Sequence, residues 1–173
     1  VVYEVLDIHP SFNNGKYQKI LRYLEKYCIE KCDSVVVSSN GFSSYLQKNY
    51  NLDNIIIQEN RINDKHRHYF RPEILNFEHP IKIGFFGKIR CQTSLELLFD
   101  YCRAWPEEVQ LRIAGIIPNN LEETISTGRE LQNVEILGPY DHPQGLQSLY
   151  DGCHFCWAVD NHDHVNSPLL LPN

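Results

Sequence analysis

The sequence predicts an α/β protein that consists of two half-lobes with parallel sheets, joined by a linker. First, short apolar runs such as 35–37 and 55–57 alternate with helical patterns along the chain. Second, these runs are continuously apolar, which is typical of buried parallel strands. Third, residues 61–80 lose this periodicity and carry basic residues and two prolines. Because parallel strands need long crossover connections, this order predicts one parallel sheet on each side of the linker.

Residues 1–60 are expected to form the first half-lobe. The strand over 1–6 leads into a helix over 17–32, whose apolar residues fall on one stripe at helical spacing. That stripe consists of Ile20, Leu21, Leu24, Cys28 and Cys32. We therefore expect the helix to cover the sheet with this stripe. The remaining elements in chain order are a strand at 35–37, a helix at 42–50 and a strand at 55–57.

Residues 81–173 are expected to form the second half-lobe, which opens with a buried strand from 81. Thr93 and Glu96 fit a capping box, so a helix is predicted from Ser94 to about Trp105. The further elements are a strand at 109–114, a helix to Leu131 capped by Asn120 with Glu123, a strand at 134–137, a helix at 143–150 with proline in its first turn, and a strand at 154–159.

The loop after the first strand of the second half-lobe is the main candidate site. Both half-lobes have a Rossmann-like topology, and in such open sheets ligands bind beyond the carboxyl ends of the strands. This strand ends at Gly87 and is followed by two cations, Lys88 and Arg90, ahead of a helix N-terminus. The arrangement predicts a phosphate or diphosphate ligand. The alternative is an ordinary strand-to-helix turn with solvated cations.

Composition excludes several classes of protein. The formal net charge is −6 and no lysine-arginine block occurs, which argues against a sequence-blind nucleic-acid binder. No apolar run approaches the ~20 residues of a membrane span, and the N-terminus lacks the zones of a signal peptide, so a cytoplasmic location is expected. The six cysteines are expected to be reduced. Since methionine is absent and the chain opens on a strand, we expect an excerpt of a longer protein.

A short cysteine and histidine cluster invites a zinc hypothesis. Cys153 and Cys156 are followed by His162 and His164. In an extended strand, however, residues three apart point to opposite faces, so both sulfurs reach one metal only if a turn intervenes. We therefore expect no metal, and we interpret 161–164 as a polar loop beyond a strand end.

Several motifs together resemble the retaining GT-B glycosyltransferases of family 4. The first half-lobe contributes VYEVLDIHP at 2–10, CDSVVVSS at 32–39 and Asn60. The second contributes IGFFGKIR at 83–90, LRIAG at 111–115 and NVEILG at 133–138, which leads into GLQSLY at 145–150. Each piece is moderately specific, but they occur in the family's order across nearly the whole chain.

The resemblance implies a transferase that moves a sugar from a nucleotide-diphosphate donor to a glycan or lipid-linked acceptor. The donor would be a UDP- or GDP-sugar, with no further cofactor. Asp7 matches the acidic residue of the family's "DL-P" pattern, and His9 shares its face if the strand continues. The residues implied for donor binding are Gly87, Lys88, Arg90, Gly138 and Tyr140. Peripheral association with the inner face of the membrane, through parts outside this chain, is an alternative to a purely cytoplasmic location.

This chain also departs from the family pattern. Leu6 stands where many members have histidine, and Thr93 stands where they have lysine. The E-x7-E helix would follow Asn173 and the glycine-rich first loop would precede Val1, so we expect the 173-residue chain alone to be inactive. The rival hypothesis is a non-catalytic Rossmann-like module that binds a nucleotide or a partner. A nicotinamide dehydrogenase is disfavoured because no strand leads into G-x-G-x-x-G.

The candidate side chains also have simpler explanations. Asp7 and His9 fit a local turn before Pro10, since short polar side chains often fold back on nearby backbone. Tyr140 fits an exposed turn residue. Both alternatives stay open from the sequence.

Overall fold

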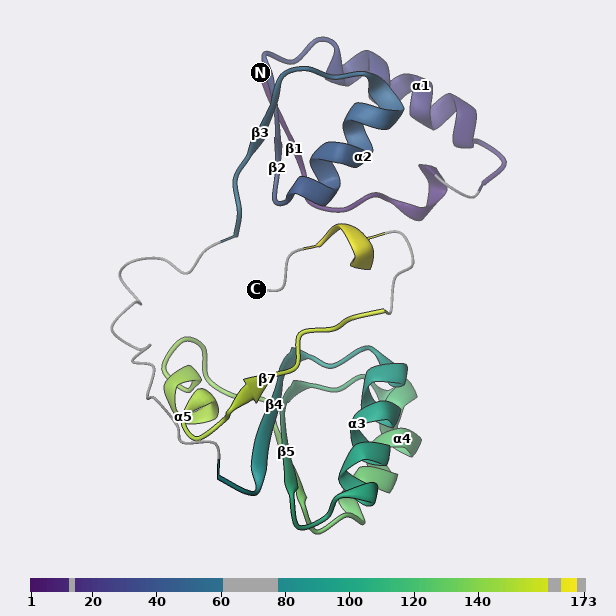
Figure 1. Ribbon diagram of the computed structural model, residues 1–173. Helices are drawn as coiled ribbons and strands as arrows, with labels where there is room; N and C mark the ends of the chain where they lie inside the picture. Colours follow the sequence, from purple (N-terminus) through teal and green to yellow (C-terminus); the bar gives the residue numbers. More distant parts are fainter. Residues whose placement is uncertain (13–14, 61–77, 162–165, 171–173) are drawn as a thin grey trace. The chain divides into compact units, whose positions relative to one another are not determined.

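The computed structural model describes residues 1–12, 15–60, 78–161 and 166–170, in two compact units (Figure 1). Unit 1 comprises the described residues 1–60 together with 166–170, and unit 2 comprises 78–161. Each unit contains helices and one parallel sheet, which confirms the predicted α/β fold class. Most of the predicted linker, 61–77, lies outside the described residues.

Unit 1 is built on a parallel sheet with the strand order β1-β2-β3. The three strands are β1 (Val2–Val5), β2 (Ser34–Val37) and β3 (Ile55–Ile57), close to their predicted positions. The crossover helices are α1 (Gln18–Ile29) and α2 (Asn40–Tyr50), and the 3-10 turns η1 (Pro10–Phe12) and η4 (Ser167–Leu169) complete the unit. Val5, Val37 and Ile57 pair across the carboxyl edge, the edge at which the strands end.

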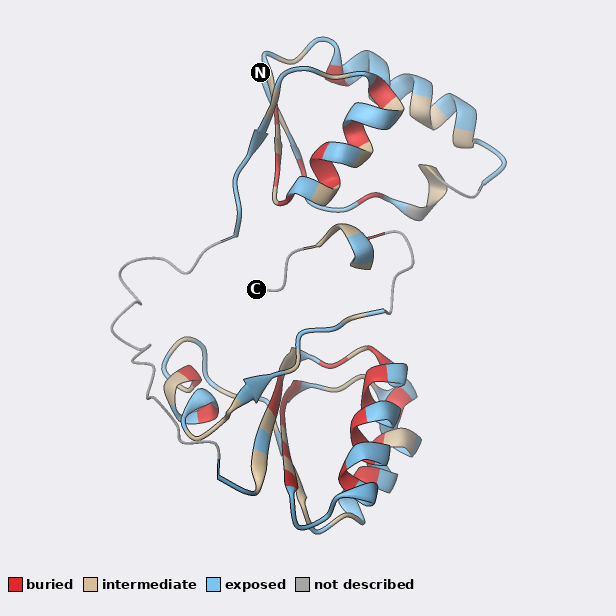
Figure 2. Cartoon of the chain, in the orientation of Figure 1, coloured by how far each residue is buried: buried red, intermediate tan, exposed pale blue. Residues whose placement is uncertain are grey.

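Helix α2 supplies most of the helical packing in unit 1. Phe42 and Leu46 are fully buried against Val35 and Val37 of β2. Figure 2 shows buried residues along α2, whereas α1 is drawn mainly in the colours of exposed and intermediate residues. The core of this unit therefore lies between the sheet and α2.

The prediction that the apolar stripe of α1 covers the sheet is wrong. Ile20 and Leu24 are 58% and 51% exposed, and the inward side of α1 carries charged residues. The Glu25 carboxylate accepts hydrogen bonds from the hydroxyl groups of Tyr3 (3.1 Å) and Tyr50. The inward side of α1 thus combines the buried Ile29 with the partly buried Arg22 and Glu25, and most of the predicted stripe is exposed.

Unit 2 is built on a four-stranded parallel sheet with the order β6-β5-β4-β7. Its strands are β4 (Ile81–Lys88), β5 (Val109–Ile116), β6 (Val134–Gly138) and β7 (Phe155–Cys156). The helices are α3 (Gln92–Ala104), α4 (Glu122–Arg129) and α5 (Leu146–Tyr150), with a 3-10 turn η3 (Asn119–Leu121) ahead of α4. Figure 1 shows α3 and α4 on one face of this sheet and α5 on the other side.

The core of unit 2 lies between the sheet and the pair of helices α3 and α4. Leu111 and Ile113 of β5 are fully buried, as are Leu95 of α3 and Ile125 of α4. Burying four such side chains contributes about 6–12 kcal/mol before the entropy of ordering them is counted. This packing fixes the sheet and therefore the loops at its carboxyl edge.

Several predicted helix starts in unit 2 are wrong. Helix α3 begins at Gln92 with Cys91 as N-cap residue, so Thr93 lies inside the helix and makes no capping box. The Glu96 side chain instead accepts a hydrogen bond from Gln92 Nε2 at 2.7 Å. Side-chain capping is also absent at α4, which begins at Glu122. In this unit the packing of Leu95 and Leu98 on the sheet, rather than a cap, determines where α3 lies.

Among the described residues, no helix is both long enough and apolar enough to cross a membrane. The cysteines are all free thiols, and their environments differ. Cys91 and Cys102 are buried, Cys28 and Cys156 are exposed, and Cys32 and Cys153 are intermediate.

Candidate functional site

Three neighbouring strands of unit 2 have a glycine as their last or second-to-last residue at the carboxyl edge. Gly87 of β4 pairs with Gly115 of β5, and Gly138 of β6 pairs with Ala114 after a register shift. Their backbone φ angles are +111°, +141° and +75°, values that residues other than glycine rarely adopt. A Cβ on Gly115 would lie 1.7 Å from the carbonyl oxygen of Gly87. Gly115 is thus buried against Gly87, whereas a Cβ on Gly87 or Gly138 would have open space around it, so room for a ligand to approach the main chain exists at these two glycines.

Two cations follow this glycine edge. Lys88 is the last residue of β4 and is exposed, whereas Ile89 is fully buried and anchors the loop. Arg90 is half-buried, and its Nε donates to Asp160 Oδ2 at 2.6 Å. Within the described parts of the chain, the side chain of Lys88 makes neither a hydrogen bond nor an ion pair. The edge thus carries one compensated and one uncompensated positive charge.

The segment after β7 crosses the start of α3. Ser94 Oγ donates a hydrogen bond to the Val159 carbonyl at 2.9 Å, and the backbone amide of Asn161 donates one to Cys91 Sγ at 3.4 Å. Together with the pair between Arg90 and Asp160, these contacts join the loop after β4 to the loop after β7. The segment after β7 therefore fixes the first turn of α3, and no pattern in the sequence predicts this contact.

All five residues predicted for donor binding lie in unit 2. Gly87, Lys88 and Arg90 line the end of β4, Gly138 is the last residue of β6, and Tyr140 follows it at intermediate exposure. They come from strands that are separated only by β5. The structure thus brings these positions to one edge of one sheet, and their roles in binding stay a prediction.

The predicted catalytic residues lie at the carboxyl edge of unit 1. Asp7 and His9 are both exposed, and Ile8 between them is 3% exposed and packs in the core. His9 Nδ1 accepts a hydrogen bond from the Ser11 amide at 3.3 Å, and its ring lies edge-on to Phe12. The local turn that the sequence offered as an alternative is therefore formed by His9. A catalytic role for either residue stays a prediction.

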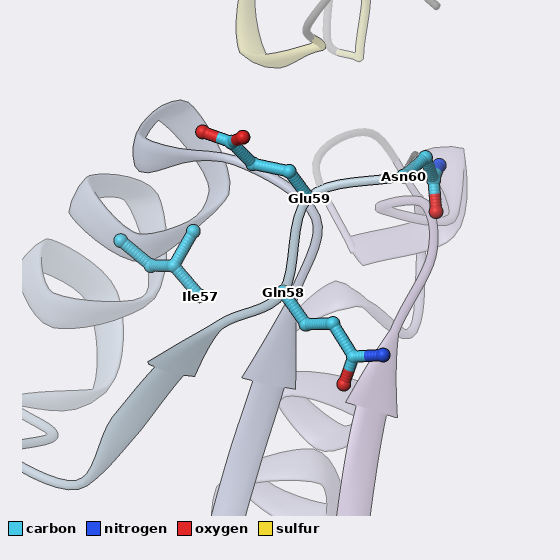
Figure 3. Close-up of a pocket in the computed structure, with 4 residues that line it drawn as sticks. All are labelled: Ile57, Gln58, Glu59 and Asn60. Carbon is cyan, nitrogen blue, oxygen red and sulfur yellow. The ribbon is translucent and has the colours of Figure 1, made fainter. Parts of the chain in front are cut away.

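A hollow at the end of β3 lies at the same edge of unit 1. Its described lining consists of Ile57, Gln58, Glu59 and Asn60 (Figure 3). Figure 3 shows Ile57 and Glu59 extending to one side of the chain and Gln58 to the other. These side chains do not converge on one point, so the hollow provides space at the edge rather than a preformed site. The sequence predicted only Asn60 at this position.

Two further polar residues at these edges were not predicted from the sequence. Asp160 pairs with Arg90, and Asn166 hydrogen-bonds both backbone groups of Ile8. Asp160 lies four residues beyond β7, so the rule that function gathers beyond strand ends would have identified it. Asn166 is brought to unit 1 by a return of the chain, for which the sequence pattern contains no signal.

No group of three or more potential metal ligands occurs within the ranges that the structure describes. His162 and His164 of the hypothetical zinc cluster lie outside the described residues. Cys153 is half-buried, and burial raises the pKa of its thiol, which disfavours the thiolate that a metal would need.

The chain was compared with known proteins in sequence and in structure. No family model matches the sequence. Over 96 residues the chain is 32% identical to the succinoglycan biosynthesis protein ExoL of Rhizobium meliloti (strain 1021), covering 54% of this chain and 24% of that protein. The chain thus spans about a quarter of the length of this curated relative.

In structure, the chain is similar to a glycosyltransferase from Rickettsia africae ESF-5. The TM-score is 0.58 at 16% sequence identity, and the match covers 86% of this chain and 42% of that one. At this level of identity the likeness concerns the fold. The two α/β units of this chain, each with a parallel sheet, therefore have the Rossmann-like architecture found in a glycosyltransferase.

Proposed function

We propose that the protein containing this chain is a retaining GT-B glycosyltransferase of family 4 that acts in polysaccharide biosynthesis. It transfers a sugar from a UDP- or GDP-linked donor to a glycan or lipid-linked acceptor. The observation that carries the proposal is the carboxyl edge of unit 2, where glycines with positive φ at or next to the ends of three strands lie beside Lys88 and Arg90. The similarity to a succinoglycan biosynthesis protein and to a glycosyltransferase fold supports the same reaction class.

In this proposal the glycine edge receives the diphosphate of the donor. Cleavage of the bond between sugar and phosphate leaves negative charge on the departing nucleotide, and fixed cations stabilise that charge. Lys88 supplies a point charge and Arg90 supplies a planar guanidinium suited to two phosphate oxygens. Gly138 leaves space beside the base, and Tyr140 packs on it. In this proposal the nucleotide-sugar is a donor substrate and no further cofactor is assigned.

Unit 1 supplies the groups near the reacting sugar and the acceptor. Asp7 accepts a hydrogen bond from an acceptor hydroxyl and, with His9, acts in proton transfer as the nucleotide departs. Both residues belong to the loop after β1, at the carboxyl edge where ligands of open α/β sheets bind.

The proposed diphosphate site is tested by measuring how tightly two matched lysine variants bind the nucleotide. We expect Lys88→Ala to weaken binding of UDP or GDP to the full-length protein roughly tenfold, because a charge-assisted hydrogen bond is worth about 1.5–3 kcal/mol. Lys82→Ala is the control, since Lys82 is an exposed lysine at the other end of β4 and changes the net charge equally. Isothermal titration calorimetry measures both. Equal affinities in the two variants would contradict the assignment of Lys88.

Arg90 is tested in the same way against Arg103. Arg103 lies in the last turn of α3 and pairs with Asp100 at 2.6 Å, so its removal also leaves a carboxylate unpaired. We expect Arg90→Ala to weaken nucleotide binding more than tenfold and Arg103→Ala to change it less than twofold. A sugar-transfer assay with UDP- and GDP-sugars then separates the enzyme from the rival binding module. Binding without transfer to any glycan or lipid-linked acceptor would favour the module.

A further inference from the structure

Asn166 makes a double hydrogen bond to the backbone of one residue in the loop that carries Asp7 and His9. Its Oδ1 accepts from the Ile8 amide at 2.6 Å, and its Nδ2 donates to the Ile8 carbonyl at 3.0 Å. Asn166 is 5% exposed, so both bonds are buried. A side-chain amide here replaces the partner strand that the main chain beyond β1 would otherwise need.

The segment around Asn166 is fixed on unit 1 by further contacts. The Ser39 hydroxyl donates a hydrogen bond to the Leu169 carbonyl. Ser39 is also the N-cap residue of α2, and its Oγ accepts a hydrogen bond from the Phe42 backbone amide at 3.2 Å. A Cβ on Gly41 would lie 2.6 Å from the Leu169 carbonyl oxygen, so the segment approaches α2 more closely than a side chain permits. Leu169 also packs against the core of the unit. Residues 166–170 therefore pack against the rest of unit 1.

The contacts of Asn166 fix the conformation of the loop after β1 at Ile8. The Ile8 side chain is buried in the core, and its amide and carbonyl are both bound by Asn166. Asp7 and His9, on either side of Ile8, are exposed. Because Ile8 is fixed at its side chain and at both backbone groups, the two neighbouring side chains are held in a defined position relative to the sheet.

We propose that Asn166 is a positioning residue, which holds the loop 6–9 so that Asp7 and His9 face the reacting groups. The proposal rests on the proposed glycosyltransferase function. Without the amide of Asn166, two buried backbone groups of Ile8 lose their partners, and the loop reorganises to reach water. A shift of about 1 Å in a reacting group is enough to cost on the order of a hundredfold in rate.

The test uses two variants and a matched asparagine control in the full-length protein. Asn166→Ala removes the amide, and Asn166→Leu keeps much of its volume but forms neither hydrogen bond. Asn133→Ala is the control, because Asn133 Nδ2 also makes two hydrogen bonds to backbone carbonyls, those of Cys102 (2.9 Å) and Val109 (2.8 Å) in unit 2. It lies at the start of β6, the end opposite to the carboxyl edge.

Two measurements are made on each variant. Hydrogen exchange of the Ile8 amide should accelerate at least about tenfold in both Asn166 variants and remain unchanged in the control. In the sugar-transfer assay, kcat should fall roughly 10- to 100-fold in both Asn166 variants, with the KM for the donor changed less than about twofold. Because loss of folded protein alone would also lower the apparent kcat at unchanged KM, kcat is referred to the folded fraction of each variant, and Asn133→Ala reports the effect of removing a comparable pair of hydrogen bonds away from the loop.

The outcomes distinguish this proposal from the proposed function. Unchanged exchange at Ile8 in both Asn166 variants would overturn the positioning role, as would faster exchange with wild-type kcat. Recovery of kcat in Asn166→Leu would overturn it as well, because packing rather than hydrogen bonding would then hold the loop. If the wild-type protein transfers no sugar, the proposed function fails and the catalytic part of this proposal fails with it. The exchange data would still decide whether Asn166 holds the loop.

Discussion

Gly115→Ala is expected to destabilise unit 2 strongly. The new Cβ would lie 1.7 Å from the Gly87 carbonyl oxygen, and the φ of +141° is itself strained for alanine. The backbone strain costs about 1–3 kcal/mol. To relieve the overlap, β4 and β5 must separate, which breaks ladder hydrogen bonds such as that from the Ile89 amide to the Ile116 carbonyl (3.0 Å) at about 0.5–1.5 kcal/mol each. The total is roughly 3–5 kcal/mol, a large part of the stability of an ordinary domain.

Urea denaturation followed by tryptophan fluorescence measures this effect in unit 2 alone, because both tryptophans of the chain, Trp105 and Trp157, belong to that unit. A loss of about 4 kcal/mol shifts the midpoint by about 2 M at a typical slope of ~2 kcal/mol per M. Gly152→Ala is the matched control, since its φ is +78° and a Cβ there has open space around it. It should cost only about 1–2 kcal/mol. If the two variants unfold within about 1 kcal/mol of each other, the close approach of β4 and β5 is refuted.

Two further predictions concern unit 1 at high pH and the reactivity of thiols. Burial, followed by the charge of Glu25, raises the pKa of Tyr3 to about 12, and burial, followed by the hydrogen bond to Glu25, raises the pKa of Tyr50. The unfolded chain ionises near pH 10 while the folded chain keeps its protons, so the free energy of unfolding should fall as the pH rises from 10 to 12 and be unaffected below. Denaturant unfolding at pH 8 to 12 measures this, and ionisation of Tyr3 and Tyr50 themselves near pH 10 in the folded protein would contradict it. Burial also raises the pKa of the Cys102 thiol to about 11, so a disulfide reagent at pH 8 should modify exposed Cys28 rapidly and Cys102 only on unfolding; equal rates would refute the burial of Cys102.

The strands were predictable from the sequence because their signals are local. The runs at 35–37, 55–57 and 134–137 are short, apolar and rich in β-branched residues, and each lies within an observed strand. The glycines at 87, 115 and 138 marked the ends of three strands to within one residue, and all three have positive φ angles. The carboxyl edges, and with them the candidate positions, follow from this pattern alone.

The orientation of α1 could not be predicted in the same way. Its amphipathic pattern is real, but which side faces the sheet depends on the Tyr3 and Tyr50 hydroxyls, which lie far from Glu25 in the sequence. The packing of residues 166–170 on unit 1 depends likewise on Ser39 and Gly41. Both features arise from contacts between distant segments, and no periodicity within one segment reports them.

The two cations of the glycine edge differ in what binding an anion requires of them. Arg90 already has a carboxylate partner at 2.6 Å, so a phosphate that binds its guanidinium must displace or share Asp160. Lys88 has no such partner within the described residues, so its charge is directly available to an incoming anion. An exposed lysine orients a ligand weakly, whereas a guanidinium held by a neighbouring loop orients it well. The edge therefore combines one cation suited to attracting a diphosphate with another suited to fixing its geometry.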